Sequence, residues 1–178
     1  MVNPASKSLT LTANGGILRV LQTTCHLSVA HDPTTGTAPP LVFPFAGIWD
    51  TGASASAISQ RVVDACGLAQ IGMTQVQTAD GLVDAETYLI NIFLPNQVGF
   101  KHVQVTKANL GQHNDMLIGM DIISAGDFAI TNKNGNTVFT FRVPSEVCFD
   151  FVKEHNLRTI PQNQKLSHGP GRRGKKKR

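Results

Sequence analysis

The chain has 178 residues, of which 41% are hydrophobic and 6% aromatic, so it is long enough for one globular domain and too short for two full lobes. The formal net charge of +4 comes from the C-terminal end, because residues 172–178 hold six of the sixteen Lys and Arg. No run of about 18 apolar residues occurs, and the N-terminal segment lacks the apolar centre of a signal peptide. The sequence therefore predicts a soluble, unexported, cytoplasmic protein with no membrane partner.

Cysteine and histidine spacing argues against a metal site. Cys25, Cys66 and Cys148 are an odd number and form no CxxC pair, which disfavours a disulfide framework or a thiolate zinc site. The six histidines show no HExxH or other paired spacing. We therefore expect reduced, buried thiols and no metal or other cofactor.

Sixteen glycines, nine prolines and no sustained 3.5- or 3.6-residue apolar period favour short strands and turns, hence an all-β domain. The first strands are expected over residues 17–29 and 41–49, separated by a loop rich in turn-forming residues. A short helix is expected over residues 59–66, with Ser59 as its N-cap and Gly67 as its C-cap.

The next expected element is a β-hairpin, because strand-like residues 75–78 and 85–94 flank Asp80-Gly81, a strong turn signal. The remaining expected strands are short: 98–107, 115–118, 127–131 and 137–142. After Pro144 the strand pattern ends. Residues 145–155 are compatible with one amphipathic helical piece, and the rest is too polar and too rich in Gly and Pro to pack.

Two short motifs carry the functional signal. Asp50 ends an apolar run and is followed by Thr51, Gly52 and a series of small residues. About 65 residues later, after the hairpin, the chain reads LIGMD, from Leu117 to Asp121. A bare DTG is common by chance, but the two motifs in this order and spacing resemble the retropepsin-like aspartic proteases, especially retroelement-type and bacterial members. The resemblance covers roughly residues 17–142.

The resemblance implies an all-β, mostly antiparallel, closed β-barrel with one short helix and a flap hairpin. It divides the chain into an N-terminal extension (1–16), a protease domain (17–143) and a C-terminal extension with a disordered basic tail (144–178). In such a family the hairpin around Asp80-Gly81 closes over a bound peptide.

The resemblance also implies that Asp50, Thr51 and Gly52 form the catalytic turn. Two carboxyls sharing one proton can activate water and protonate a peptide carbonyl, and like charges about 3 Å apart cannot both ionise. The Gly52 N–H can donate to the acid, and in the family the hydroxyl at the Thr51 position bonds the loop of a second copy. Asp80-Gly81 lacks the threonine and Asp121 follows its glycine, so the second carboxylate must come from a second chain in a C2 homodimer.

Substrate-contact candidates follow from the same resemblance. Ile48 and Trp49 are expected, with Leu117 and Ile118, to exclude water from the acids. The residues expected to contact a polypeptide substrate lie in the catalytic turn, the hairpin and the second motif: Ala53, Thr78, Ala79, Gly81, Leu82, Leu117 and Ile118.

Some positions depart from the viral pattern. Ser54-Ala55 and Met120-Asp121 stand where viral members carry substrate-gripping acids and an arginine, and we interpret Asp121 as a helix-start acid. The resulting hypothesis is an aspartic endopeptidase. The alternative is a dimeric, peptide-binding adaptor with the same fold and little or no cleavage.

A third reading, nucleic-acid binding, depends on the basic tail alone. The GRRGKKKR segment can neutralise several phosphates but holds no aromatic residue to stack on bases.

Overall fold

The computed structural model describes residues 5–78 and 81–159. The chain divides into two compact units, Met1–Glu146 and Val147–Arg178. Within the described residues, no helix has the length and apolar character needed to cross a membrane.

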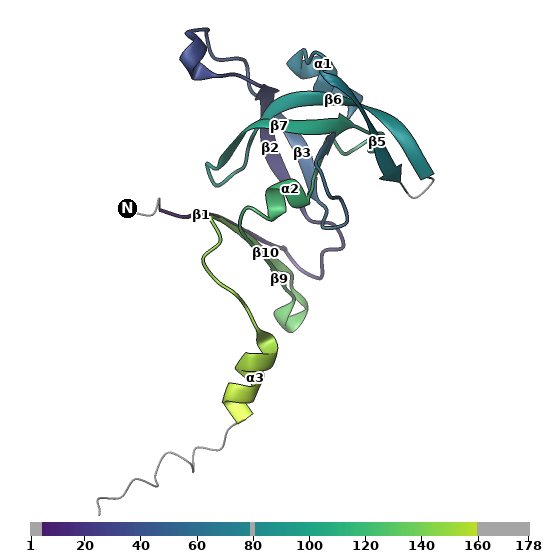
Figure 1. Ribbon diagram of the computed structural model, residues 1–178. Helices are drawn as coiled ribbons and strands as arrows, with labels where there is room; N and C mark the ends of the chain where they lie inside the picture. The colour runs from purple at the N-terminus through teal and green to yellow at the C-terminus, as the bar shows by residue number, and fades with distance from the viewer. Residues whose placement is uncertain (1–4, 79–80, 160–178) are drawn as a thin grey trace, which may run out of the picture. The chain divides into compact units, whose positions relative to one another are not determined.

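A seven-stranded sheet forms the larger part of the first unit (Figure 1). Its spatial order is β2 (Gln22–Val29), β3 (Phe43–Trp49), β8 (Met116–Ile118), β4 (Ala57–Ile58), β7 (Gly99–Lys107), β6 (Gly81–Phe93) and β5 (Gly72–Thr78). Strand β6 also pairs with β2, from His26↔Phe93 to Val29↔Ile90, so the pairing returns to the first strand. The sheet is therefore barrel-like, and its strands are mostly antiparallel.

The expectation of a closed barrel is corrected in one respect, since the barrel is not strictly closed. Strands β4 and β8 have only two and three residues, so they provide few ladder hydrogen bonds between their longer neighbours. Strand β6 has 13 residues and changes register against β7 between Ile90 and Ile92. At that irregularity the buried Asn91 side chain accepts a hydrogen bond from the His102 N–H at 3.0 Å.

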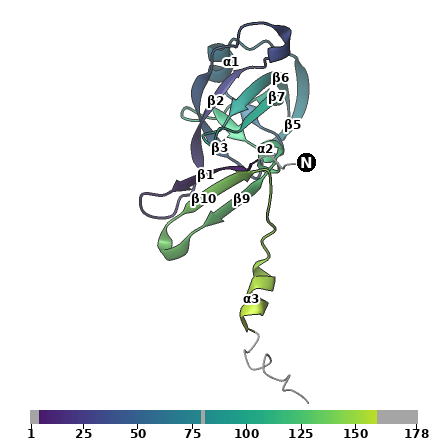
Figure 2. The same cartoon turned by 90° about the vertical axis from the view of Figure 1, so that its left-hand side faces the viewer.

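A second, three-stranded antiparallel sheet has the order β1 (Lys7–Thr12), β10 (Val138–Val143), β9 (Asp127–Thr131). Phe139 and Phe141 of β10 are fully buried, and Leu9 and Leu11 of β1 pack against the same core with a two-residue period. The short helix α2 (Met120–Ile123) lies between the two sheets in both views (Figures 1 and 2).

The sequence pattern does not predict strand β1, because Leu9 and Leu11 are its only apolar residues and the others are polar. It lies within the segment 1–16 that the sequence separated as an extension, whereas the structure places it in the same unit as the other strands. That unit ends at Glu146, against the expected domain end at residue 143.

The predicted helix after the first motif is confirmed as α1 (Gln60–Cys66), with Ser59 at the N-cap and Gly67 in the left-handed conformation at the C-cap. The hairpin around Asp80-Gly81 is confirmed as β5 and β6, both longer than predicted. Residues 17–21, expected as strand, precede β2. Short 3-10 helices cover Pro33–Thr35 and Lys133–Gly135.

In the second unit, helix α3 (Phe151–Thr159) begins later than the helical piece expected from residue 145. Asp150 sets this start, because its carboxylate accepts the Lys153 N–H at 2.9 Å and its carbonyl accepts the Glu154 N–H at 3.0 Å. The disordered tail predicted after this helix lies outside the described residues.

The expectation of three buried thiols is wrong in part. Cys25 is buried, Cys66 is half-buried and Cys148 is exposed. Only Cys25 belongs to the buried core of the sheet.

Candidate active site

Parallel pairing between β3 and β8 brings the two sequence motifs together. Trp49 lies opposite Ile118 in the register, and the next residue, Asp50, donates its N–H to the Ile118 carbonyl at 3.0 Å. The turn after β3 therefore begins where β8 ends. Segments far apart in the sequence form one site at the end of two neighbouring strands.

The Asp50 carboxylate is half-buried and has few partners. Its Oδ1 accepts the Gly52 N–H at 2.8 Å, and the Asp50 carbonyl accepts the Ala53 N–H at 3.2 Å, which closes the turn. A side chain at position 52 would place its Cβ 3.1 Å from Asp50 Oδ1, so glycine leaves the acid its space. Across residues 5–78 and 81–159, no ion pair includes Asp50. The carboxylate is held by a neutral donor and is not neutralised by a cation.

A hollow of about 310 Å³ adjoins Asp50 and Thr51. It is lined by two chain segments and two side chains of β9: Leu18–Leu21, Ile48–Thr51, Phe128 and Ile130. Thr51 is exposed, and its hydroxyl has no hydrogen-bond partner in the part of the chain that the structure describes. Val20 and Ile130, which line this hollow, are 55% and 46% exposed, so part of its rim is apolar.

The residue before Asp50 anchors the turn in the core. The Trp49 ring lies 4.8 Å from the Phe141 ring and 5.1 Å from the Phe139 ring, measured between centroids. The Trp49 indole N–H donates to the Thr23 hydroxyl at 3.0 Å, which satisfies its one polar group. Ring packing on one side and this hydrogen bond on the other fix the end of β3.

The substrate-contact candidates divide between two places. Ala53 and Leu117 are half-buried beside the Asp50 turn, whereas Ile118 is fully buried and contributes to the site through packing. On the hairpin, Leu82 is 65% exposed and Gly81 has a φ of 120°, a conformation that favours glycine.

The other hairpin candidates are Thr78 and Ala79. Thr78 ends β5 opposite Gly81, and its hydroxyl donates to the Gly81 carbonyl at 2.9 Å. Ala79 and the turn residue Asp80 lie outside the described residues.

The interpretation of Asp121 as a helix-start acid is confirmed. Asp121 lies in the first turn of α2 and its Oδ1 accepts the Ile122 N–H at 3.0 Å. The same oxygen also accepts from the Ser56 hydroxyl at 2.8 Å. The sequence does not predict this contact, because nothing in two separate motifs indicates which small polar residue contacts which acid.

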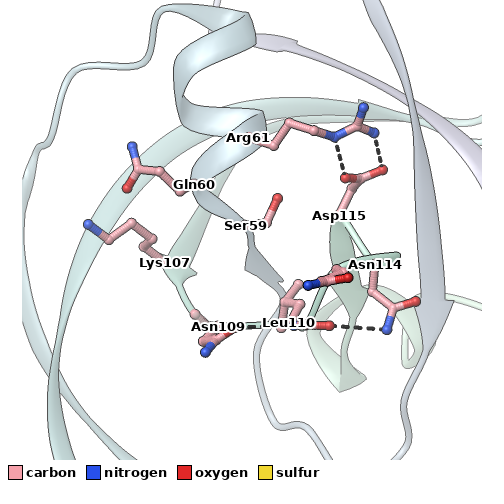
Figure 3. A pocket seen from close by; sticks show the side chains of 11 residues that line it. Ser59, Gln60, Arg61, Lys107, Asn109, Leu110, Asn114 and Asp115 are labelled. Carbon is pink, nitrogen blue, oxygen red and sulfur yellow. Dashed lines mark hydrogen bonds and ion pairs between the residues drawn. The ribbon is translucent and has the colours of Figure 1, made fainter.

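A second hollow, of about 400 Å³, lies at the start of α1 beside the end of β7 and the loop before β8 (Figure 3). Arg61 and Asp115 face one another on one side of it, joined by hydrogen bonds from Arg61 Nε at 2.7 Å and Arg61 Nη2 at 2.5 Å. The Ser59 hydroxyl also lines this hollow and is buried without a partner among the described residues. Asp50 is not among its lining residues.

Asp115 is a structural acid. Its Oδ2 also accepts the Ala46 N–H at 2.9 Å, so one side chain links β3, the start of β8 and α1. Burial by itself would raise the pKa of Asp115, but the hydrogen bonds from Arg61 and from the Ala46 N–H outweigh it and lower that pKa below its usual range. The carboxylate is therefore held in its charged form.

The described residues offer no ligand set for a metal ion. Among residues 5–78 and 81–159, no group of three His, Cys, Asp or Glu side chains gathers in a way that could hold a metal ion. The chemistry of the Asp50 turn is that of a carboxylate, a backbone N–H and an exposed hydroxyl.

Comparison with known proteins places this site in context. The family described as "gag-polyprotein putative aspartyl protease" matches residues 43–125, a range that contains both motifs and the hairpin between them. No curated protein sequence matches the chain.

Similar solved structures include a retropepsin-like aspartic protease from Rickettsia conorii (13% identity, TM-score 0.46, covering 80% of this chain and 99% of that one). Another is EIAV protease complexed with the inhibitor HBY-793 (18%, 0.44, 64% and 91%). A third is the retroviral protease-like domain of Ddi1 from Leishmania major (17%, 0.39, 69% and 95%).

Proposed function

We propose that this chain, which the family match and the all-β fold identify as retropepsin-like, is an aspartic endopeptidase. In this proposal, water is activated by two Asp50 carboxylates, one from each of two chains. The observation that carries the proposal is the state of Asp50, which is held by the Gly52 N–H, has no cationic partner in the described chain and opens on a hollow.

The proposed chemistry needs one proton shared between two acids. When two carboxyls lie within about 3 Å, repulsion keeps one of them protonated. The ionised Asp50 removes a proton from water as the oxygen attacks the peptide carbonyl, and the protonated Asp50 donates its proton to the carbonyl oxygen. In the second step the Asp50 that took the water proton gives it to the amide nitrogen and the C–N bond breaks. A hydroxyl of the tetrahedral intermediate returns its proton to the other Asp50 as the C=O bond re-forms, so the pair again holds one proton.

A homodimer is proposed because the chain has one Asp-Thr-Gly motif and the reaction needs two acids. The surface around Asp50 supports this assembly. The Thr51 hydroxyl is exposed, and the half-exposed Val20 and Ile130 form an apolar rim that a second copy would cover.

The proposed substrate is an extended polypeptide. The hairpin of β5 and β6 presents the exposed apolar side chains of Leu82 and Val83 near its tip, where a peptide could pack. Extended peptides bind well along such strands, because main-chain hydrogen bonds and alternating side-chain contacts act together.

A screen of diverse peptides from acid to neutral pH, with a metal chelator present, tests the proposal. We expect the wild-type chain to cut a subset of them and Asp50→Asn to cut none, because an amide cannot shuttle the proton. A wild-type chain that binds peptides and leaves every one intact would instead support the adaptor alternative.

A further inference from the structure

Ser56 connects the two motif loops through its side chain. It is fully buried, its hydroxyl donates to Asp121 Oδ1 at 2.8 Å, and it accepts the Gly119 N–H at 3.1 Å. A hydroxyl has one proton to give, so donation to Asp121 leaves the oxygen lone pairs to face Gly119. The carboxylate can only accept, which fixes the direction of this chain of hydrogen bonds.

The two loops touch closely at this point. The Met120 N–H donates to the Ala53 carbonyl at 2.8 Å. A Cβ added to Gly119 would lie 2.7 Å and 2.8 Å from the Ala55 carbonyl carbon and oxygen, so no side chain fits between the loops. The loop that carries Asp50 therefore rests directly on the backbone of the loop that carries Asp121.

Asp121 itself is oriented from its own loop. The oxygen that accepts from Ser56 also accepts the Ile122 N–H at 3.0 Å, which ties the carboxylate to the first turn of α2. In the described part of the chain no cation pairs with Asp121. Its contacts are thus directed at the junction of the two loops and not at a charge elsewhere.

We propose that Asp121 is a positioning residue for the Asp50 turn, acting through Ser56 and the Gly119 N–H. By holding Ser56, it keeps residues 50–56 seated on Gly119, so that the Asp50 carboxylate stays where its symmetry partner must meet it. This inference rests on the proposed function. It gives Asp121 a second role, beyond that of an acid in the first turn of α2.

Kinetics of four variants test this role: Asp121→Ala, Asp121→Asn, Ser56→Ala and Ser56→Thr. Because a displacement of about 1 Å can cost about 100-fold in rate, we expect kcat to fall about 10- to 100-fold in the two alanine variants, with KM nearly unchanged. Asp121→Asn and Ser56→Thr keep an acceptor and a hydroxyl, so they should recover most of kcat. Rates are compared at equal folded fraction, measured by thermal melting.

The chain offers a matched control, since the Ser145 hydroxyl donates to Asp127 Oδ1 at 2.6 Å at the end of β10. Ser145→Ala removes a similar bond away from the site and should leave kcat unchanged. A full kcat in Asp121→Ala, or an equal loss in Ser145→Ala, would overturn the inference.

Amide exchange separates this inference from the proposed function. In the Asp50→Asn background, where no hydrolysis is expected, Asp121→Ala should speed exchange of the Gly52 and Gly119 amides by about 10-fold or more relative to strand amides. Unchanged exchange would overturn the positioning role whether or not the enzyme is active. Faster exchange in a protein whose wild type cuts nothing would retain the coupling between the loops and reject the protease.

Discussion

Asp50 directly follows β3 and Asp115 directly precedes the neighbouring parallel strand β8, and the surroundings of these two acids differ. Asp115 accepts two hydrogen bonds from Arg61 and one from the Ala46 N–H, and its side chain is only 8% exposed. Asp50 is half-buried and its carboxylate accepts from the Gly52 N–H.

Availability of a carboxylate for chemistry depends on what it is bonded to. Asp115 is paired with an arginine, which lowers the pKa of its carboxyl group, so it stays ionised. Its hydrogen bonds then hold neighbouring elements together. An acid held by one neutral donor can share a proton with a second acid brought next to it. The partners of the side chain therefore separate an acid that is held ionised from one that is free to share a proton.

The largest expected effect is loss of hydrolysis on changing Asp50. Asp50→Asn should lower kcat by about 10,000-fold or more, so that no cleavage is detected, because both acid–base groups of the proposed pair are lost, and it should leave the melting temperature unchanged. A mixing experiment tests whether both acids are needed. When equal amounts of wild-type and Asp50→Asn chains exchange subunits, the wild-type activity should fall by about half, because half of the wild-type chains then pair with inactive ones. A hydrolysis rate that is unchanged after exchange with the Asp50→Asn chain would contradict a shared site.

The next effect concerns assembly at the same turn. Thr51→Ala removes the exposed hydroxyl of each chain and keeps both carboxylates. In the proposed dimer, a partner left unpaired costs about 1–3 kcal/mol at each of two symmetric places. The dimer should therefore dissociate at higher protein concentration, with activity lost most on dilution. Ultracentrifugation beside activity assays checks this, and a fully active monomer would reject it.

A smaller effect, on stability alone, is expected at Asp115. Asp115→Ala should lower the free energy of unfolding by about 1–3 kcal/mol at pH 7, a value reduced because the Arg61 side chain is 67% exposed. The matched control is Glu154→Ala, which removes an exposed ion pair with Arg158 and should change stability little.

The pH dependence of that loss has a definite sign. The pKa of Asp115 is lower in the folded chain than in the unfolded one, so its contribution is present above the unfolded pKa of about 3.9 and is lost as pH falls through the folded pKa. The stability gap between wild type and Asp115→Ala should therefore narrow below about pH 4. Urea unfolding from pH 7 to pH 3 measures this gap, and a gap that widens in acid would show that Asp115 is not held ionised.

Much of the fold could be predicted because its elements have local signals. Apolar runs end at turn formers, Gly67 ends α1 in the left-handed conformation, and Asp80-Gly81 joins two strands. Strand β4 and helix α2 are different. They have two and four residues, too short for a periodic pattern, and they exist because β7, β8 and the first motif loop surround them.

The Asp50-Thr51-Gly52 turn was predictable as a motif, but its environment was not. The Asp50-Thr51-Gly52 sequence states which residues occur together, whereas the contact of Ser56 with Asp121 depends on how β3 and β8 align. The pairing of Arg61 with Asp115 likewise follows from packing of α1 against the sheet. Long-range contacts between side chains are set by the fold and leave no mark in local spacing.

The three cysteines also differ in their surroundings, and alkylating the exposed one is expected to affect function least. Cys148 is exposed, whereas burial raises the pKa of the Cys66 thiol to about 11 and that of the Cys25 thiol to about 12. Because the thiolate is the reactive form, alkylation near pH 8 should proceed in the order Cys148, Cys66, Cys25.

Cys25 is enclosed on several sides: its Sγ lies 3.7 Å from the Phe45 carbonyl oxygen and 3.8 Å from Met116 Sδ. Alkylation there requires the sheet to open, so its rate should follow unfolding and rise with urea. Mass spectrometry of labelled peptides over time measures all three rates, with Cys148→Ser removing the fast phase. Labelling of Cys148 alone should leave peptide hydrolysis unchanged, since the proposed chemistry uses carboxylates. Rapid modification of Cys25 in the folded chain would mean that the core around Phe45 and Met116 is open to solvent.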